Sequence, residues 1–185
     1  MDELLPNIIV TVQIDAPQEC GGLEKEWLQA AVKCGLNGSL PAEAEGQISL
    51  VLTDDETVRE LNRQYRGLDR TTDVLSFSFD HWGHWEGDDD APTPDNDTPT
   101  NWPLPDDEPP PLGEIVVSVP QAERQASSHG VPLRRELALL IVHGALHLLG
   151  HDHYVNNERE TMQALERVAM AALFGVGEDQ VGGAK

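Results

Sequence analysis

The feature that most constrains this chain is a run of four histidines that follows an apolar stretch near its C-terminal end. Residues 137–149 are apolar almost all round, which is typical of a helix buried in a core. His143 and His147 lie four residues apart in this stretch, so on a helix they share one face, with Cβ atoms about 5–6 Å apart. A buried neutral imidazole needs a polar partner. The sequence therefore predicts a central helix with two histidines on one side.

The spacing of the histidines predicts a metal site. One histidine on an apolar helix is more often a hydrogen-bonded core residue, but four histidines within residues 143–153 favour a metal. Gly150 stands where the residue after a helix turns left-handed, so the chain folds back and brings His153 within reach as a third ligand. His151 is the weaker member of the motif: it is a hydrogen-bond donor to a ligand, a proton shuttle, a surface residue or, less readily, a metal ligand itself. Three histidines without cysteine leave one coordination position open, which is typical of a catalytic zinc.

An open metal site of this kind is suited to hydrolysis. The ion would lower the pKa of bound water to about 7 and polarise a phosphoryl or carbonyl oxygen. Metzincin proteases share the histidine spacing, but they need a glutamate directly after the first histidine as general base. That position is Gly144 here, which disfavours a protease. Hydrolysis of a phosphoester and a purely structural metal both stay open.

Hydrophobic periodicity predicts an α+β fold. Strands are expected at residues 7–14, 47–52, 73–79 and 112–120. Helices are expected at residues 23–34, 54–66, 121–128, 132–149 and 157–174. The resulting order, β-α-β-α-β-β-α-α-α, predicts one mixed sheet of about four strands with about five helices, the metal-binding helix innermost. In the last helix, Glu158, Glu160 and Glu166 are expected to be solvated unless one of them orients a ligand histidine.

An acidic, proline-rich segment interrupts this pattern. Residues 80–112 contain ten acidic residues, eight prolines and no Lys or Arg. Such a composition cannot bury enough apolar surface to order itself, so residues 81–111 are expected to be a flexible insertion within a single domain. The net charge is −21, and 23 acidic residues face 12 basic ones outside the segment. A nucleic acid would therefore have to bind a local basic surface, weakly and in a salt-sensitive way.

Four arginines supply such a surface. The helix expected to carry them begins with a capping box, Thr53 with Glu56, and buries Val58, Leu61 and Tyr65. Its other side and the residues just beyond carry Arg59, Arg63, Arg66 and Arg70. These side chains either form weak surface ion pairs with Asp54, Asp55 and Glu56 or clamp the phosphates of an RNA backbone with their planar guanidinium groups.

The chain has no sign of a membrane or export segment. No apolar run reaches membrane-spanning length, and residues 1–4 lack the basic start and apolar core of a signal peptide. Cys20 and Cys34 are isolated and are expected to be free thiols. A cytoplasmic protein without a membrane partner is expected.

Three further segments carry recognisable motifs. They are Leu61-Asn62-Arg63-Gln64-Tyr65-Arg66, Thr72-Asp73-Val74-Leu75-Ser76-Phe77 and Leu112-Gly113-Glu114-Ile115-Val116-Val117-Ser118. Together with the histidine motif, they resemble the YbeY family of single-domain metal-dependent endoribonucleases and rRNA maturation factors. The resemblance covers essentially the whole chain except the insertion. Thr71 stands where the family usually has Pro, and Glu114 where it usually has Asp.

The resemblance implies a function and a set of site residues. The family's metal ligands fall on His143, His147 and His153, which would hold one Zn²⁺ or another divalent transition metal. The implied activity is cleavage of single-stranded RNA in 16S rRNA 3′-end maturation and ribosome quality control, with the small ribosomal subunit and its assembly factors as partners. The family's important arginine falls on Arg66, which would stabilise charge on phosphorus. His151 and Glu114 are candidates for general acid and base, and a non-catalytic assembly factor is the main alternative.

Overall fold

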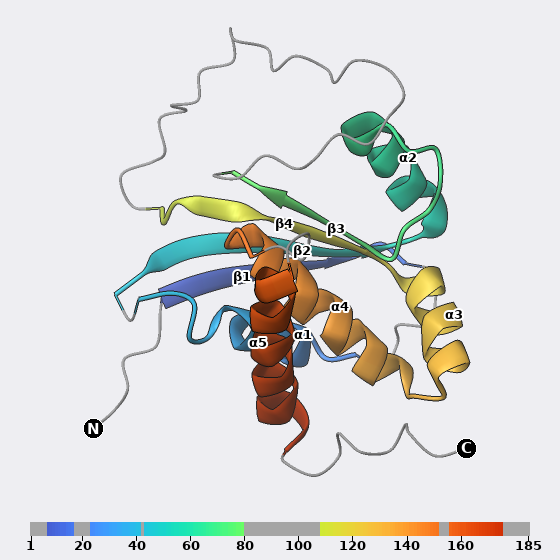
Figure 1. Cartoon of the computed structure of the whole chain (residues 1–185). Helices are drawn as coiled ribbons and strands as arrows, with labels where there is room; N and C mark the ends of the chain where they lie inside the picture. The colour runs from blue at the N-terminus through green and yellow to red at the C-terminus, as the bar shows by residue number, and fades with distance from the viewer. Residues whose placement is uncertain (1–6, 17–22, 42, 80–107, 152–155, 176–185) are drawn as a thin grey trace, which may run out of the picture.

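The computed structural model describes residues 7–16, 23–41, 43–79, 108–151 and 156–175 (Figure 1). The elements in these ranges follow the predicted order. They are β1 (Asn7–Ile14), α1 (Lys25–Leu36), β2 (Glu45–Thr53), α2 (Asp55–Arg66), β3 (Val74–Ser78), β4 (Pro111–Ser118), α3 (Val119–His129), α4 (Leu133–Leu148) and α5 (Asn156–Phe174). The α+β class is therefore confirmed. Most of the predicted insertion lies outside the described residues, but its last residue, Pro111, already belongs to β4.

The four strands form one mixed sheet in the order β1-β2-β4-β3. β1 pairs with β2, and β2 with β4, in parallel, while β3 pairs with β4 in antiparallel fashion. The helix α1 connects the parallel strands β1 and β2, and the chain between β2 and β4 contains α2 and β3, so each parallel pair has the long connection that it requires. In this order β3 lies at one edge of the sheet.

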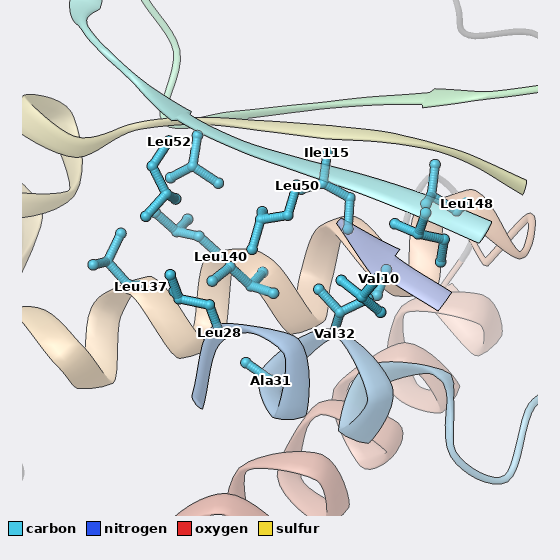
Figure 2. Close-up of a cluster of buried hydrophobic side chains, with 14 of the residues drawn as sticks. Val10, Leu28, Ala31, Val32, Leu50, Leu52, Ile115, Leu137, Leu140 and Leu148 are labelled. Atoms are coloured by element: carbon cyan, nitrogen blue, oxygen red, sulfur yellow. The ribbon is translucent and has the colours of Figure 1, made fainter. Parts of the chain in front are cut away.

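Helices lie on both faces of the sheet (Figure 1). α1, α4 and α5 lie on one side of the sheet and α2 on the other. Alternate residues of β4 point to opposite faces, as strand geometry demands. Ile115 and Val117 join the large core beside α1 and α4, whereas Val116 packs with Val58 of α2. Figure 2 shows this large core, in which side chains of the strands meet those of α1 and α4.

α4 is the central helix of the larger layer. Leu137, Ile141 and Leu146 are fully buried along it. α1 approaches α4 closely at Gly35, which has no Cβ. A Cβ at that position would lie only 2.9 Å from the Cβ of Ala145. Met162 of α5 packs in the cluster on another side of α4. Within the described part of the chain, no helix combines the length and the apolar character needed to cross a bilayer.

Three local predictions are wrong. The N-cap of α2 is Asp54, whose carboxylate accepts a hydrogen bond from the Thr57 N–H at 2.8 Å, so the predicted capping box at Thr53 does not form. Tyr65 is 53 % exposed rather than buried. The fourth strand ends at Ser118, whose hydroxyl caps α3 by accepting from the Gln121 N–H, so the last two predicted strand residues are helical.

Candidate functional site

His143 and His147 form a pair on one side of α4, as the i, i+4 spacing predicts. Their Nε2 atoms are 3.0 Å apart. The two rings meet nearly edge to face, with centroids 4.6 Å apart and an interplanar angle of 78°. The His143 side chain is 29 % exposed, so the pair lies at the boundary of the core. Both imidazoles thus present the same ring nitrogen to a common point.

Glu166 of α5 holds one of these rings in place. Its Oε1 lies 2.7 Å from Nδ1 of His143, and its side chain is only 16 % exposed. A carboxylate at this distance accepts the proton of Nδ1, which leaves Nε2 of His143 with its lone pair facing His147. Of the three glutamates considered in the last helix, Glu166 is therefore the one that orients a histidine.

The pair fits two corners of a tetrahedral metal site. Two nitrogens bound at about 2.0–2.1 Å to one tetrahedral ion lie roughly 3.3–3.4 Å apart. The observed 3.0 Å between the two Nε2 atoms needs an adjustment of only a few tenths of an ångström. The predicted third ligand, His153, lies outside the described residues, and the residues that are described contain no group of three His, Cys, Asp or Glu side chains suited to a metal. Metal binding by this site stays a prediction.

The turn after α4 forms as the sequence predicts. Gly150 has a φ of 79°, the left-handed conformation that a glycine adopts without strain. The Gly150 N–H donates to the His147 carbonyl at 3.0 Å, and the His151 N–H donates to the Leu146 carbonyl at 3.2 Å. These two bonds make a Schellman motif, which ends the helix and reverses the chain. The His151 ring lies with its Nε2 3.3 Å from the hydroxyl oxygen of Ser39.

Gly144, between the two histidines, faces the sheet. A Cβ at this position would lie 2.8 Å from Cγ2 of Ile115 and 3.1 Å from Oγ of Ser76. There is accordingly no room for the glutamate that a metzincin protease carries directly after its first histidine. The packing of α4 on β3 and β4 supports the prediction that this is not a site of protease chemistry.

Glu114 and Arg66 lie on the other face of the sheet. Glu114 is two residues before Val116 on β4, so it shares the face that packs with α2. Arg66 is the last residue of α2. The sheet thus separates both from the face on which α4 carries the histidine pair (Figure 1). Their catalytic roles stay predictions, and the arrangement favours contacts with a substrate away from the metal.

Two arginines of the predicted RNA-binding surface, Arg59 and Arg63, are engaged in surface ion pairs. Arg59 pairs with Asp69 through two bonds of 2.7 and 3.0 Å, and Arg63 pairs with Glu60. The hydrogen bond from Arg59 lowers the pKa of the Asp69 carboxyl. Both arginine side chains are 55 % exposed, so these pairs are weak and open to competition by phosphate. The partners differ from those expected, because Asp54 caps the helix and Asp55 binds Arg124.

Comparisons with known proteins identify the chain. The model of the family described as Endoribonuclease YbeY matches residues 13–174. A Heliobacterium modesticaldum protein with that description is 43 % identical over 148 residues, which are 78 % of this chain and 81 % of the relative. One from Shouchella clausii is 37 % identical over 172 residues, 91 % of this chain and 99 % of the relative. A solution structure of a Thermotoga maritima protein has the same fold, with a TM-score of 0.53 at 21 % identity over 95 % of this chain and 100 % of that one. The chain therefore belongs to the Endoribonuclease YbeY family.

Proposed function

We propose that this chain is a metal-dependent endoribonuclease that cleaves single-stranded RNA. The observation that carries the proposal is the pair of Nε2 atoms of His143 and His147 at 3.0 Å, with His143 oriented by Glu166. Family membership supplies the reaction, because the relatives are described as endoribonucleases. The chemistry of the site and the assignment of the reaction thus rest on independent observations.

The proposed metal is one Zn²⁺, held by His143, His147 and His153. Three imidazoles suit zinc and leave one position for the substrate or water, although other divalent transition metals accept the same ligands. When bound, the ion supplies an activated water and a Lewis acid for the scissile phosphate. Glu166 keeps the Nε2 lone pair of His143 directed at the ion. His151, next to the turn, is the candidate to move a proton to or from the reacting oxygens.

The arginines of α2 and the following loop are proposed to bind the RNA. Arg59, Arg63, Arg66 and Arg70 lie within twelve residues of one another. Their guanidinium groups suit phosphate oxygens, and the carboxylates that now pair with Arg59 and Arg63 are exposed enough to be displaced. Arg66 stays the candidate to stabilise charge at phosphorus. Because α2 lies on the far face of the sheet, Arg66 is also proposed to hold the RNA backbone away from the metal.

The proposed cellular role is maturation of the 3′ end of 16S rRNA and ribosome quality control in the cytoplasm. The proposed partners are the small ribosomal subunit and its assembly factors. This part of the proposal is supported by the motifs that the chain shares with the family, including Thr72-Asp73-Val74-Leu75-Ser76-Phe77. A non-catalytic assembly factor with the same fold would bind these partners without cutting RNA.

Cleavage of labelled single-stranded RNA tests the activity. Wild type should cut, and His147→Ala should lose both bound metal and cleavage while its circular dichroism spectrum stays the same. Arg66→Ala should keep its metal but cleave at least tenfold more slowly, since charged contacts to phosphate contribute about 1.5–3 kcal/mol. Arg167→Ala, an exposed arginine of α5, is the control and should behave as wild type.

Two outcomes would contradict the proposal. If His147→Ala loses its metal but cuts as fast as wild type, the activity belongs to a contaminant and the chain is better described as a metal-stabilised assembly factor. If wild type with bound metal leaves single-stranded RNA intact, the nuclease activity itself is refuted.

A further inference from the structure

Exposed aromatic rings gather on the face of the sheet opposite the histidine pair. Phe79 is 70 % exposed and Tyr65 is 53 % exposed. The ring of Tyr65 meets that of Phe77 edge to face, with centroids 5.0 Å apart. Leu75 and Phe77 pack on the α2 side of β3. Phe79 follows the last residue of β3, and its N–H donates to the Leu112 carbonyl at 3.3 Å, which continues the pairing with β4. Alternation therefore places Phe79 on the same side as Phe77. We call Tyr65, Phe77 and Phe79 the aromatic surface.

Packing among the described residues does not explain this surface. Among the described residues, the other large apolar side chains that are exposed are Ile9 of β1 and Val168 of α5. α2 lies on this face of the sheet (Figure 1), and the aromatic surface lies where the C-terminal end of that helix meets β3. An exposed apolar cluster rimmed by polar groups is typical of a binding site.

The charge distribution favours a ligand that is held by more than its phosphates. Arg63 and Arg66 lie in the last turn of α2, the same turn that carries Tyr65. Arg63 is already paired with Glu60, and the chain as a whole carries a charge of −21. Attraction of phosphates is therefore small, and a polyanion needs a second, uncharged contact to bind. Stacking of nucleobases on aromatic rings supplies such a contact, whatever the base sequence.

We propose that the aromatic surface stacks the bases of single-stranded RNA. This inference rests on the proposed function and adds the place where the substrate is held. The edge strand β3 separates the aromatic surface from α4, whose Leu148 carbonyl accepts a hydrogen bond from Ser78 of β3 at 3.1 Å. An RNA strand bound at the rings reaches the histidine pair around this edge. The stacked bases are therefore neighbours of the cleaved bond rather than the bases at it.

Binding of a short fluorescent single-stranded RNA, measured by anisotropy with the full-length protein, tests this inference. Phe79→Ala should weaken binding roughly tenfold, the size expected for loss of one stacked base. Phe79→Tyr keeps a flat ring and should bind as wild type. Val168→Ala removes an equally exposed apolar side chain from α5 and should have no effect. The loss in Phe79→Ala should be the same at low and high salt, because stacking involves no net charge.

A second oligonucleotide separates stacking from general damage. RNA with abasic sites in place of its bases should bind wild type and Phe79→Ala equally, because the partner of the ring is absent. Unchanged RNA binding by Phe79→Ala overturns the inference, as does an equal loss in Phe79→Tyr. Cleavage of the RNA, followed on the same samples, tests the proposed function separately. If wild type does not cut RNA but still needs Phe79 to bind it, the nuclease activity is refuted and base stacking on the aromatic surface is supported. A wild type that does not bind RNA refutes both.

Discussion

Replacing Glu166 by Gln should weaken metal binding without unfolding the protein. The Glu166 carboxylate accepts from Nδ1 of His143 at 2.7 Å and is 16 % exposed, so the bond is short, charge-assisted and mostly shielded from water. Glutamine keeps the shape but loses the charge that makes the imidazole a better donor of electrons to the ion. Loss of such a partner typically lowers metal affinity about 10- to 100-fold. That factor corresponds to about 1.4–2.7 kcal/mol of binding free energy.

The assay is a competition for Zn²⁺ between the protein and a fluorescent chelator. The matched control is Glu160→Gln, an exposed glutamate of the same helix, which should bind zinc as wild type does. Thermal unfolding of the metal-free proteins checks that Glu166→Gln is folded. If the folded Glu166→Gln variant binds zinc as tightly as wild type, Glu166 does not orient a metal ligand. If wild type itself binds no zinc or other transition metal, the metal site is refuted.

Two stability predictions follow from local geometry. Gly144→Ala should destabilise the fold by about 1–3 kcal/mol in urea unfolding, because its Cβ would lie 2.8 Å from Cγ2 of Ile115; an unchanged midpoint would mean that α4 can shift away from the sheet. Asp54→Ala should cost about 0.5–2 kcal/mol at neutral pH by removing the cap on the Thr57 N–H. That hydrogen bond lowers the pKa of Asp54 in the folded state, so its stabilisation is complete above the ordinary aspartate pKa and is lost as the pH falls through the lower, folded value. The difference between Asp54→Ala and wild type should therefore shrink in acid, and a constant difference from neutral to acid pH would exclude the carboxylate as its source.

Much of the fold was predictable because its signals are local. Strand alternation at residues 7–14 and the apolar run before His143 depend only on neighbouring residues, and both predict elements that the structure contains. Gly150 likewise marks the end of α4, since few other residues adopt its left-handed conformation. The i, i+4 spacing of His143 and His147 places both on one side of the helix, whatever surrounds it.

The boundaries were less predictable because competing caps differ by single residues. The start of α2 offers three residues of the types that cap helices, Thr53, Asp54 and Asp55. The hydrogen bond from the Thr57 N–H shows that Asp54 is the cap. Tyr65 continues the apolar spacing of α2, but its ring meets only the edge strand β3, at Phe77, and is left 53 % exposed. Hydrophobic periodicity shows which residues share one face of a helix. It does not show how far the sheet beneath that helix extends.

The sequence by itself determined the helix that carries His143 and His147 and the turn that follows it. Only the tertiary structure decided what surrounds them, because those contacts join residues far apart in the chain. The approach of α5 makes Glu166 the partner of His143, and the contact of α4 with β3 and β4 explains why Gly144 is a glycine. Alternation along β4 predicts two faces, but the placement of α2 and α4 on opposite sides of the sheet assigned Glu114 to the face away from the histidines. The physical reason is that periodicity is encoded locally, whereas the choice of which face each helix covers is made by packing of the whole core.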